Sequence, residues 1–234
     1  MMKHRSARSG ARMKSVLVDP IPVKYNGADE LQMAATHPLI QEDKEWSLHV
    51  DFRAVPLSGE QFYRLSVDNP ELRLELTAEG ELILMSPTGA RTGHRNSELN
   101  YQLVGWAKAD GAGLAFDSST VFSLPSGAKR SPDAAWVRKE RWDALSDEEQ
   151  EKFAPLCPDF VAELRSPSDS LDELKSKMEE YIQNGSMLGW LIDPVEKRVY
   201  VYRPGLGVEC LEAPKSLLGD PVLKGLVLDL HEIL

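Results

Sequence analysis

A single carboxylate inside an apolar strand constrains this chain more than any other feature of its sequence. In Phe160-Val161-Ala162-Glu163-Leu164, four apolar residues surround Glu163. Strand alternation places Val161 and Glu163 on one face, and the other three residues on the opposite face, where they can pack a core. An ionised carboxylate is costly to bury without a partner, so Glu163 predicts a partner close to this strand.

A second acid, Asp133, follows Pro132 and begins another apolar segment, residues 133–137. Functional groups commonly lie where a strand meets a loop. Two carboxylates on neighbouring strands suffice for Mg²⁺, which prefers oxygen ligands and keeps several waters. The sequence therefore predicts that Asp133 and Glu163 share Mg²⁺ or Mn²⁺. Two plainer interpretations stay open: Asp133 as a turn residue, and a buried ion pair between Glu163 and Arg165.

Nearby cations suit phosphodiester hydrolysis. A divalent metal screens the charge of the phosphate and lowers the pKa of bound water, and a Lys or Arg beside it stabilises charge in the transition state. Arg165 shares a strand face with Glu163, whereas Lys175 and Lys177 flank the apolar stripe of the next helix on opposite sides. We expect Lys177 to be the catalytic cation and Arg165 to give a supporting phosphate or carboxylate contact.

Hydrophobic periodicity predicts an α/β core that starts near Ser58. Helices are expected from Ser58 to before Pro70, from Arg95 to Ala109, and from Ser170 to Asn184. Strands are expected over residues 72–76, 82–85, 114–116, 120–124, 133–137, 160–165, 189–194, 199–202 and 208–211. Residues 1–56 are predicted to form an N-terminal extension, partly disordered with a basic start, and residues 57–234 the catalytic domain.

The composition narrows the class of protein. Of the 234 residues, 42% are hydrophobic, which allows a sizeable core, and the formal net charge is −10. This acidity argues against a protein that coats nucleic acid nonspecifically, because such binding depends on neutralised phosphates. Cys157 and Cys210 have no metal-binding spacing, so a cytoplasmic protein with free thiols is expected. No apolar run reaches membrane-spanning length.

A set of spaced positions resembles the Uma-two family, bacterial proteins described as candidate endonucleases of restriction-endonuclease-like fold. The resemblance covers about residues 57–204 and rests on Glu75, Gly80, Met85-Ser86-Pro87, His94, Pro132-Asp133, Glu163, Ser166-Pro167-Ser168, Lys177, Tyr181, Gly185 and Trp190-Leu191-Ile192-Asp193-Pro194.

The resemblance implies a PD-(D/E)XK nuclease: a central mixed β-sheet flanked by helices, a divalent metal, DNA as substrate and a homodimer. Asp133 would match the first acid of the superfamily motif and Glu163 the second. The lysine that usually stands two residues after the second acid is Arg165 here. The family resemblance instead assigns the lysine to Lys177, on the following helix.

Several alternatives remain at this stage. Glu75 and His94 are candidate accessory site residues, although a solvated strand residue and a structural histidine are the more common cases. The DNA-binding surface is expected to come from a local basic patch, drawn from Arg91, Arg95, Lys129, Arg130, Arg138, Lys139 and Arg141. The rival functions are a silent nuclease fold that binds nucleic acid or a protein, and a glycoside hydrolase that uses the two acids.

Overall fold

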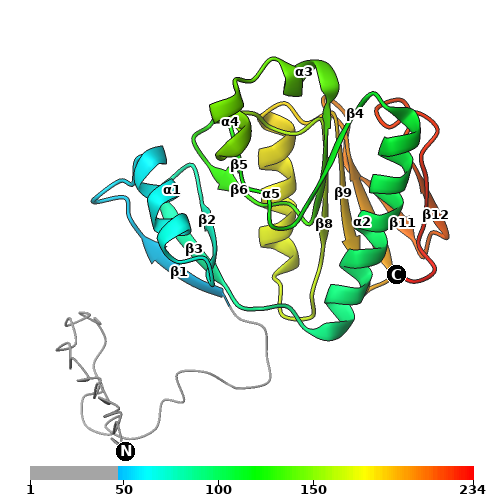
Figure 1. Ribbon diagram of the computed structural model, residues 1–234. Coiled ribbons are helices and arrows are strands. Elements are labelled where there is room, and N and C mark those ends of the chain that lie inside the picture. Colours follow the sequence, from blue (N-terminus) through cyan, green and yellow to red (C-terminus); the bar gives the residue numbers. More distant parts are fainter. Residues whose placement is uncertain (1–46) are drawn as a thin grey trace, which may run out of the picture. The chain divides into compact units, whose positions relative to one another are not determined.

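The computed structural model describes residues 47–234, so the predicted basic tail and most of the predicted extension lie outside the described residues. A six-stranded sheet forms the centre (Figure 1). Its order is β11 (Glu209–Glu212), β10 (Arg198–Tyr202), β9 (Leu188–Asp193), β8 (Phe160–Leu164), β7 (Ala134–Arg138) and β4 (Gly113–Asp117). Only the β8–β9 pair is parallel, which makes the sheet mixed, as predicted.

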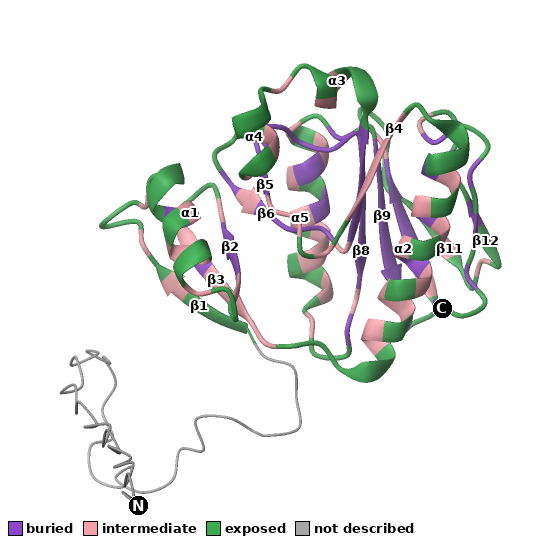
Figure 2. Ribbon diagram, in the orientation of Figure 1, coloured by how far each residue is buried: buried purple, intermediate pink, exposed green. Residues whose placement is uncertain are grey.

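Two helices cover opposite faces of this sheet: α2 (Ala90–Asp110) and α5 (Leu171–Gln183). Leu99 of α2 packs in one core with Phe160, whereas Met178 of α5 packs in another with Val161. Because both faces of β8 are covered, all five of its residues are buried (Figure 2). The alternation predicted for this strand therefore separates two cores rather than a core from solvent.

A second, smaller sheet is antiparallel throughout. Its order is β1 (Ser47–Asp51), β3 (Glu81–Met85), β2 (Arg73–Leu76), β6 (Lys129–Arg130) and β5 (Phe122–Ser123). Helix α1 (Gly59–Asp68), capped by Ser58 as predicted, buries Phe62 with Leu74 and Leu82. Strand β1 lies in the segment that the sequence assigned to the extension. Its five residues alternate polar and apolar, but the run is short and mostly exposed.

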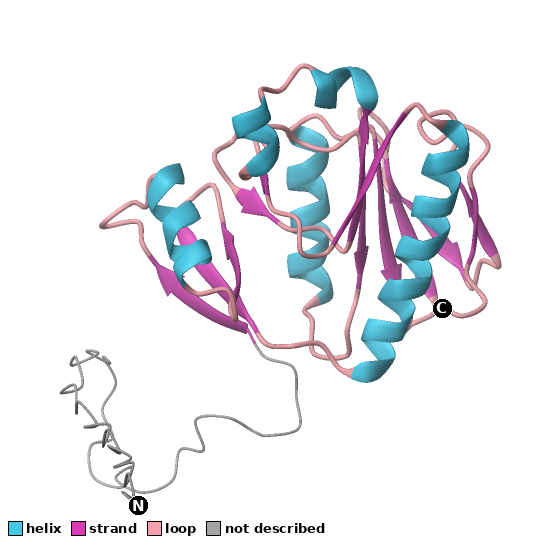
Figure 3. Ribbon diagram, in the orientation of Figure 1, coloured by secondary structure: helices cyan, strands magenta, loops and turns pink. Residues whose placement is uncertain are grey.

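The remaining elements are short (Figure 3). They are α3 (Lys139–Asp143), α4 (Asp147–Glu151), β12 (Ser216–Leu218) and β13 (Val227–Asp229). Leucines of the C-terminal segment, among them Leu217 and Leu228, join the core on the α2 side. Among residues 47–234, no helix combines the length and apolarity that crossing a membrane requires.

Helix α2 begins earlier than the sequence indicates. Its first residue is Ala90, five positions before the predicted start at Arg95, and Gly89 stands at the N-cap in an extended conformation. The N-terminal turns of α2 are polar and lack the apolar residues at helical spacing that predict a helix. Arg91, His94 and Arg95 therefore lie within the first two turns of the helix.

Candidate active site

The two predicted acids lie at the same end of neighbouring strands. Strands β7 and β8 are antiparallel with Ala134 opposite Ala162, so Asp133 and Glu163 adjoin this pair on the same side. The backbone N–H of Leu164 donates to Asp133 Oδ2 at 2.8 Å. Both carboxylates line one pocket of about 1100 Å³, which also has α5 and the small sheet in its wall.

Helix α5 brings Lys177 and Tyr181 to Glu163. Lys177 Nζ lies 2.9 Å from Glu163 Oε1, and Tyr181 Oη donates to the same oxygen at 2.9 Å. The two residues are four positions apart and share one face of the helix. The Lys177 side chain is only 14% exposed, so its stem packs while the ammonium reaches the end of the strand.

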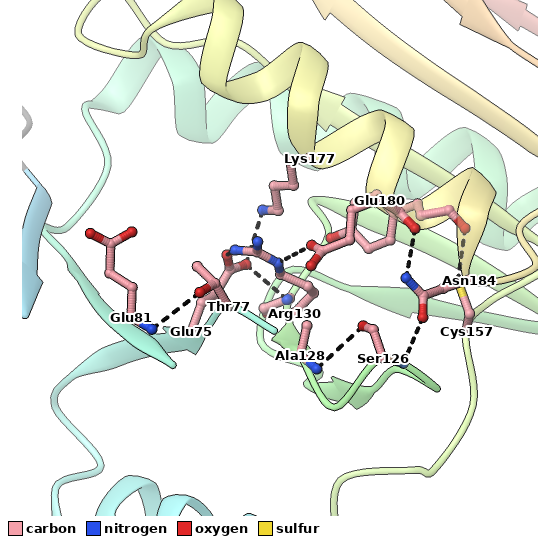
Figure 4. Close-up of polar contacts among 12 residues, drawn as sticks. Glu75, Thr77, Glu81, Ser126, Ala128, Arg130, Cys157, Lys177, Glu180 and Asn184 are labelled. Carbon is pink, nitrogen blue, oxygen red and sulfur yellow. Dashed lines mark hydrogen bonds and ion pairs between the residues drawn. The ribbon is translucent and has the colours of Figure 1, made fainter. Parts of the chain in front are cut away.

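Glu75 is also part of this cluster, although a glutamate at such a strand position is more commonly exposed to solvent. It is 2% exposed, and its Oε1 lies 2.9 Å from Lys177 Nζ. Arg130 Nη1 donates to Glu75 Oε2 at 3.0 Å, and Arg130 Nε donates to Glu180 at 2.6 Å. Figure 4 shows Arg130 between the two carboxylates, with Lys177 directed at Glu75.

The position of Arg130 comes from strand pairing. Strand β6 pairs with β2 through Lys129 and Leu76, and the next residue, Arg130, reaches Glu75. The backbone N–H of Ser131 donates to Glu75 Oε1 at 2.9 Å. Residues 75 and 130 are far apart in the chain and no local pattern links them, so this ion pair could not be predicted from the sequence.

Burial and charge set the protonation states of the cluster. Burial raises the pKa of Glu163 to about 7; the Lys177 charge opposes this rise, and the nearby Asp133 and Glu75 charges add to it. Burial alone would raise the pKa of Glu75 too, but Lys177 and Arg130 bring it below its ordinary value. Burial opposes protonation of Lys177, yet Glu163 and Glu75 raise its pKa, so its ammonium stays charged.

Asp133 and Tyr181 complete this picture. Burial raises the pKa of Asp133, partly offset by the hydrogen bond from the Leu164 N–H and by the Lys177 and Arg73 charges. Burial and the adjacent Glu163 raise the pKa of Tyr181 well above its usual value. Tyr181 is therefore a hydrogen-bond donor that orients Glu163, and not a base. In the sequence, Tyr181 stood out only as one of the positions that resemble the Uma-two family, with no predicted role at the site.

The donor set fits a hard, partly hydrated cation. Asp133 and Glu163 offer oxygen ligands in one pocket, and burial raises the pKa of each, a cost that a cation beside them would relieve. In the described part of the chain, no three His, Cys, Asp or Glu residues form a ready metal cage. Mg²⁺ needs no such cage, because it binds through one or two carboxylates and retains water.

Other predicted site residues lie elsewhere. Arg165 Nη1 is 2.7 Å from Asp193 Oδ2, so this arginine pairs with the end of β9 rather than with Glu163. His94 Nε2 is 3.2 Å from Glu232 Oε2, and both side chains are exposed. His94 and Glu232 are far apart in the chain, so this pairing could not be predicted from a local pattern.

Three arginines of the predicted basic patch lie at two separate places. Arg130 is buried in ion pairs with Glu75 and Glu180. Arg138 and Arg141 both pair with Asp159, which precedes β8 and therefore lies at the end of the strand away from Glu163. Arg138 and Arg141 therefore lie at the opposite end of β8 from the pocket, which Arg130 lines.

The fold and the site together resemble those of nucleases: in a mixed sheet, Asp133 immediately precedes β7 and Glu163 lies on β8, with Lys177 on the next helix. The model of the Uma2 family, described as "Putative restriction endonuclease", matches residues 60–231, and the chain belongs to this family.

One solved structure supports the fold assignment. The chain is similar to a "putative nuclease belonging to DUF820" from Anabaena variabilis, with 24% identity and a TM-score of 0.64. The match covers 76% of this chain and 97% of the other. At this identity the likeness establishes the fold alone. The comparison with curated proteins found no match.

Proposed function

We propose that this protein is an endonuclease that hydrolyses DNA phosphodiester bonds with Mg²⁺ or Mn²⁺ bound by Asp133 and Glu163. One observation carries the proposal: the Lys177 ammonium lies 2.9 Å from Glu163, in the pocket that Asp133 also lines. A cation beside two acids that can hold a metal is the minimum needed for phosphodiester hydrolysis. Membership of a family described as "Putative restriction endonuclease" supports this chemistry.

The residues of the pocket then have distinct roles. When bound, the metal would lower the pKa of an attacking water and screen the phosphate charge. Lys177, held charged by two carboxylates, stabilises negative charge that develops on the phosphate. Tyr181 fixes the rotamer of Glu163. Glu163 must lose its proton to act as a ligand, so its raised pKa makes cation binding pH-dependent near neutrality.

Glu75 and Arg130 position the lysine. Glu75 receives Arg130 on one oxygen and Lys177 on the other, which fixes the ammonium between Glu75 and Glu163. Arg165, committed to Asp193, is assigned a structural role in this proposal rather than a phosphate contact.

A cleavage assay tests the proposal. Supercoiled plasmid DNA is incubated with the protein and Mg²⁺ or Mn²⁺, and in parallel with EDTA. We expect nicking with metal, none with EDTA, and a loss of about a hundredfold or more in Asp133→Asn. Absence of nicking in every metal, or undiminished nicking by Asp133→Asn, would contradict the proposal.

A second candidate function is favoured by the charge of the pocket. Ten Asp and Glu side chains line it, against three basic residues, Arg73, Arg130 and Lys177, and one histidine, His49. A surface of this sign suits a catalytically silent protein that binds a partner, as the net charge of −10 also does. Metal-independent DNA binding without cleavage, or binding of a basic protein partner, would favour this candidate.

The homodimer implied by the family resemblance stays a prediction, to be checked by analytical ultracentrifugation.

A further inference from the structure

The basic residues of the pocket differ in what they contact. Lys177 pairs with Glu75 and Glu163, and Arg130 pairs with Glu75 and Glu180. Arg73 makes no ion pair with any carboxylate of residues 47–234. Its single hydrogen bond in this part of the chain runs from Nη2 to the backbone oxygen of Ser118 at 3.4 Å, near the limit for such a bond.

Arg73 lies close to the acids of the site. It precedes Glu75 by two positions on β2, so both side chains project from the same face of the small sheet. Both residues line the pocket, and Arg73 is half-buried there. Its positive charge lowers the pKa of Asp133, which places the guanidinium within electrostatic reach of that carboxylate.

We infer that Arg73 binds a phosphate of the DNA strand that enters the pocket, next to the bond that is cleaved. The inference rests on the proposed nuclease function and names the group that receives the substrate. A guanidinium presents five N–H donors in a planar fork that matches two phosphate oxygens. Within residues 47–234, the donors of Arg73 other than the Nη2–H that reaches Ser118 remain available, whereas Lys177 and Arg130 have theirs directed at carboxylates.

The charge of the pocket explains why one such residue has a large effect. Ten acidic side chains repel a phosphate that approaches the site. Every other basic side chain of the described lining pairs with a carboxylate. Without Arg73, the approaching strand would therefore meet no unpaired basic side chain there. Losing one charge-assisted contact of this kind costs roughly tenfold or more in affinity.

The test uses binding in a background that does not cleave. Glu163→Gln protein is titrated onto a fluorescein-labelled DNA duplex in Mg²⁺ buffer, followed by anisotropy, at NaCl concentrations from about 50 to about 200 mM. Arg73→Ala and Arg73→Lys are compared in that background. Arg64→Ala is the matched control, because Arg64 is an exposed arginine of α1 that pairs with Glu60 and does not line the pocket.

We expect Arg73→Ala to weaken binding roughly tenfold or more, and to reduce the slope of log affinity against log salt by about 0.9, the value for one lost phosphate contact. Arg73→Lys keeps the charge, so it should restore the slope while recovering only part of the affinity. Arg64→Ala should match its parent.

The two proposals fail in different ways. If Arg73→Ala is folded by circular dichroism and binds with the affinity and salt slope of its parent, the inference on Arg73 is overturned and the nuclease proposal stands. Should Arg73→Ala fail to fold, Arg73→Gln takes its place with the same expectations. If the Glu163→Gln parent binds neither duplex nor single-stranded DNA at the lowest salt, both proposals are overturned.

Discussion

The stability of the protein should depend on pH through Glu163, and Glu163→Gln isolates this dependence. Burial raises the pKa of Glu163 to about 7 from a reference value of 4.5. The folded state therefore holds this proton more tightly than the unfolded state does. The stabilisation is fully present below pH 4.5 and is lost as pH rises through 7.

The size of the effect follows from the shift. A rise from 4.5 to about 7 corresponds to about 3 kcal/mol of unfolding free energy. The side chain is 5% exposed, so solvent screening reduces this figure little. Gln has nearly the shape of Glu and can still accept the Tyr181 hydrogen bond, but it does not titrate. The variant should thus gain about 3 kcal/mol relative to the parent between pH 4.5 and pH 8.

Urea unfolding in EDTA, followed by tryptophan fluorescence at several pH values, measures this difference. Titrating groups distant from Glu163 contribute equally to both proteins and cancel. Glu179→Gln, an exposed change on the same helix, is the matched control and should follow the parent. If the curves of parent and Glu163→Gln stay parallel across this pH range, the assignment of Glu163 as a buried, proton-binding acid is wrong.

Three further outcomes are expected. Lys177→Met should reduce the cleavage rate by about a hundredfold or more. Lys175→Met should stay near the parent rate, because the Lys175 ammonium lies over the Tyr200 ring. Equal losses in the two variants would refute the role of Lys177. Asp133→Asn should abolish the heat of Mg²⁺ binding in calorimetry with the folded state retained, and an unchanged isotherm would remove Asp133 from the metal site. Arg130→Met should lower the unfolding free energy by about 3–5 kcal/mol because it strips two carboxylates of a buried partner; a change below about 1 kcal/mol in urea unfolding would show that solvent replaces it.

Local pattern alone determined much of the scaffold. The Ser58 cap, the hairpin of β2 and β3, the helix after Ser170 and the strand around Glu163 follow from short-range spacing and capping, and the structure contains all four. Local rules also identified Glu163 as an anomaly, since a carboxylate among four apolar residues implies a partner. Local rules also predicted that Lys175 and Lys177 do not reach the same site, because their side chains lie on opposite sides of the buried stripe of the helix.

The partners of these residues were decided only by the tertiary structure. Pairing of β6 with β2 brings Arg130 to Glu75, and the packing of α5 against β8 brings Tyr181 to Glu163. The same long-range contacts commit Arg165 to Asp193 and leave Arg73 without a carboxylate partner in residues 47–234. Periodicity reports which face of an element is buried, but ion pairs between elements distant in sequence depend on strand order and register, which a single sequence does not encode locally.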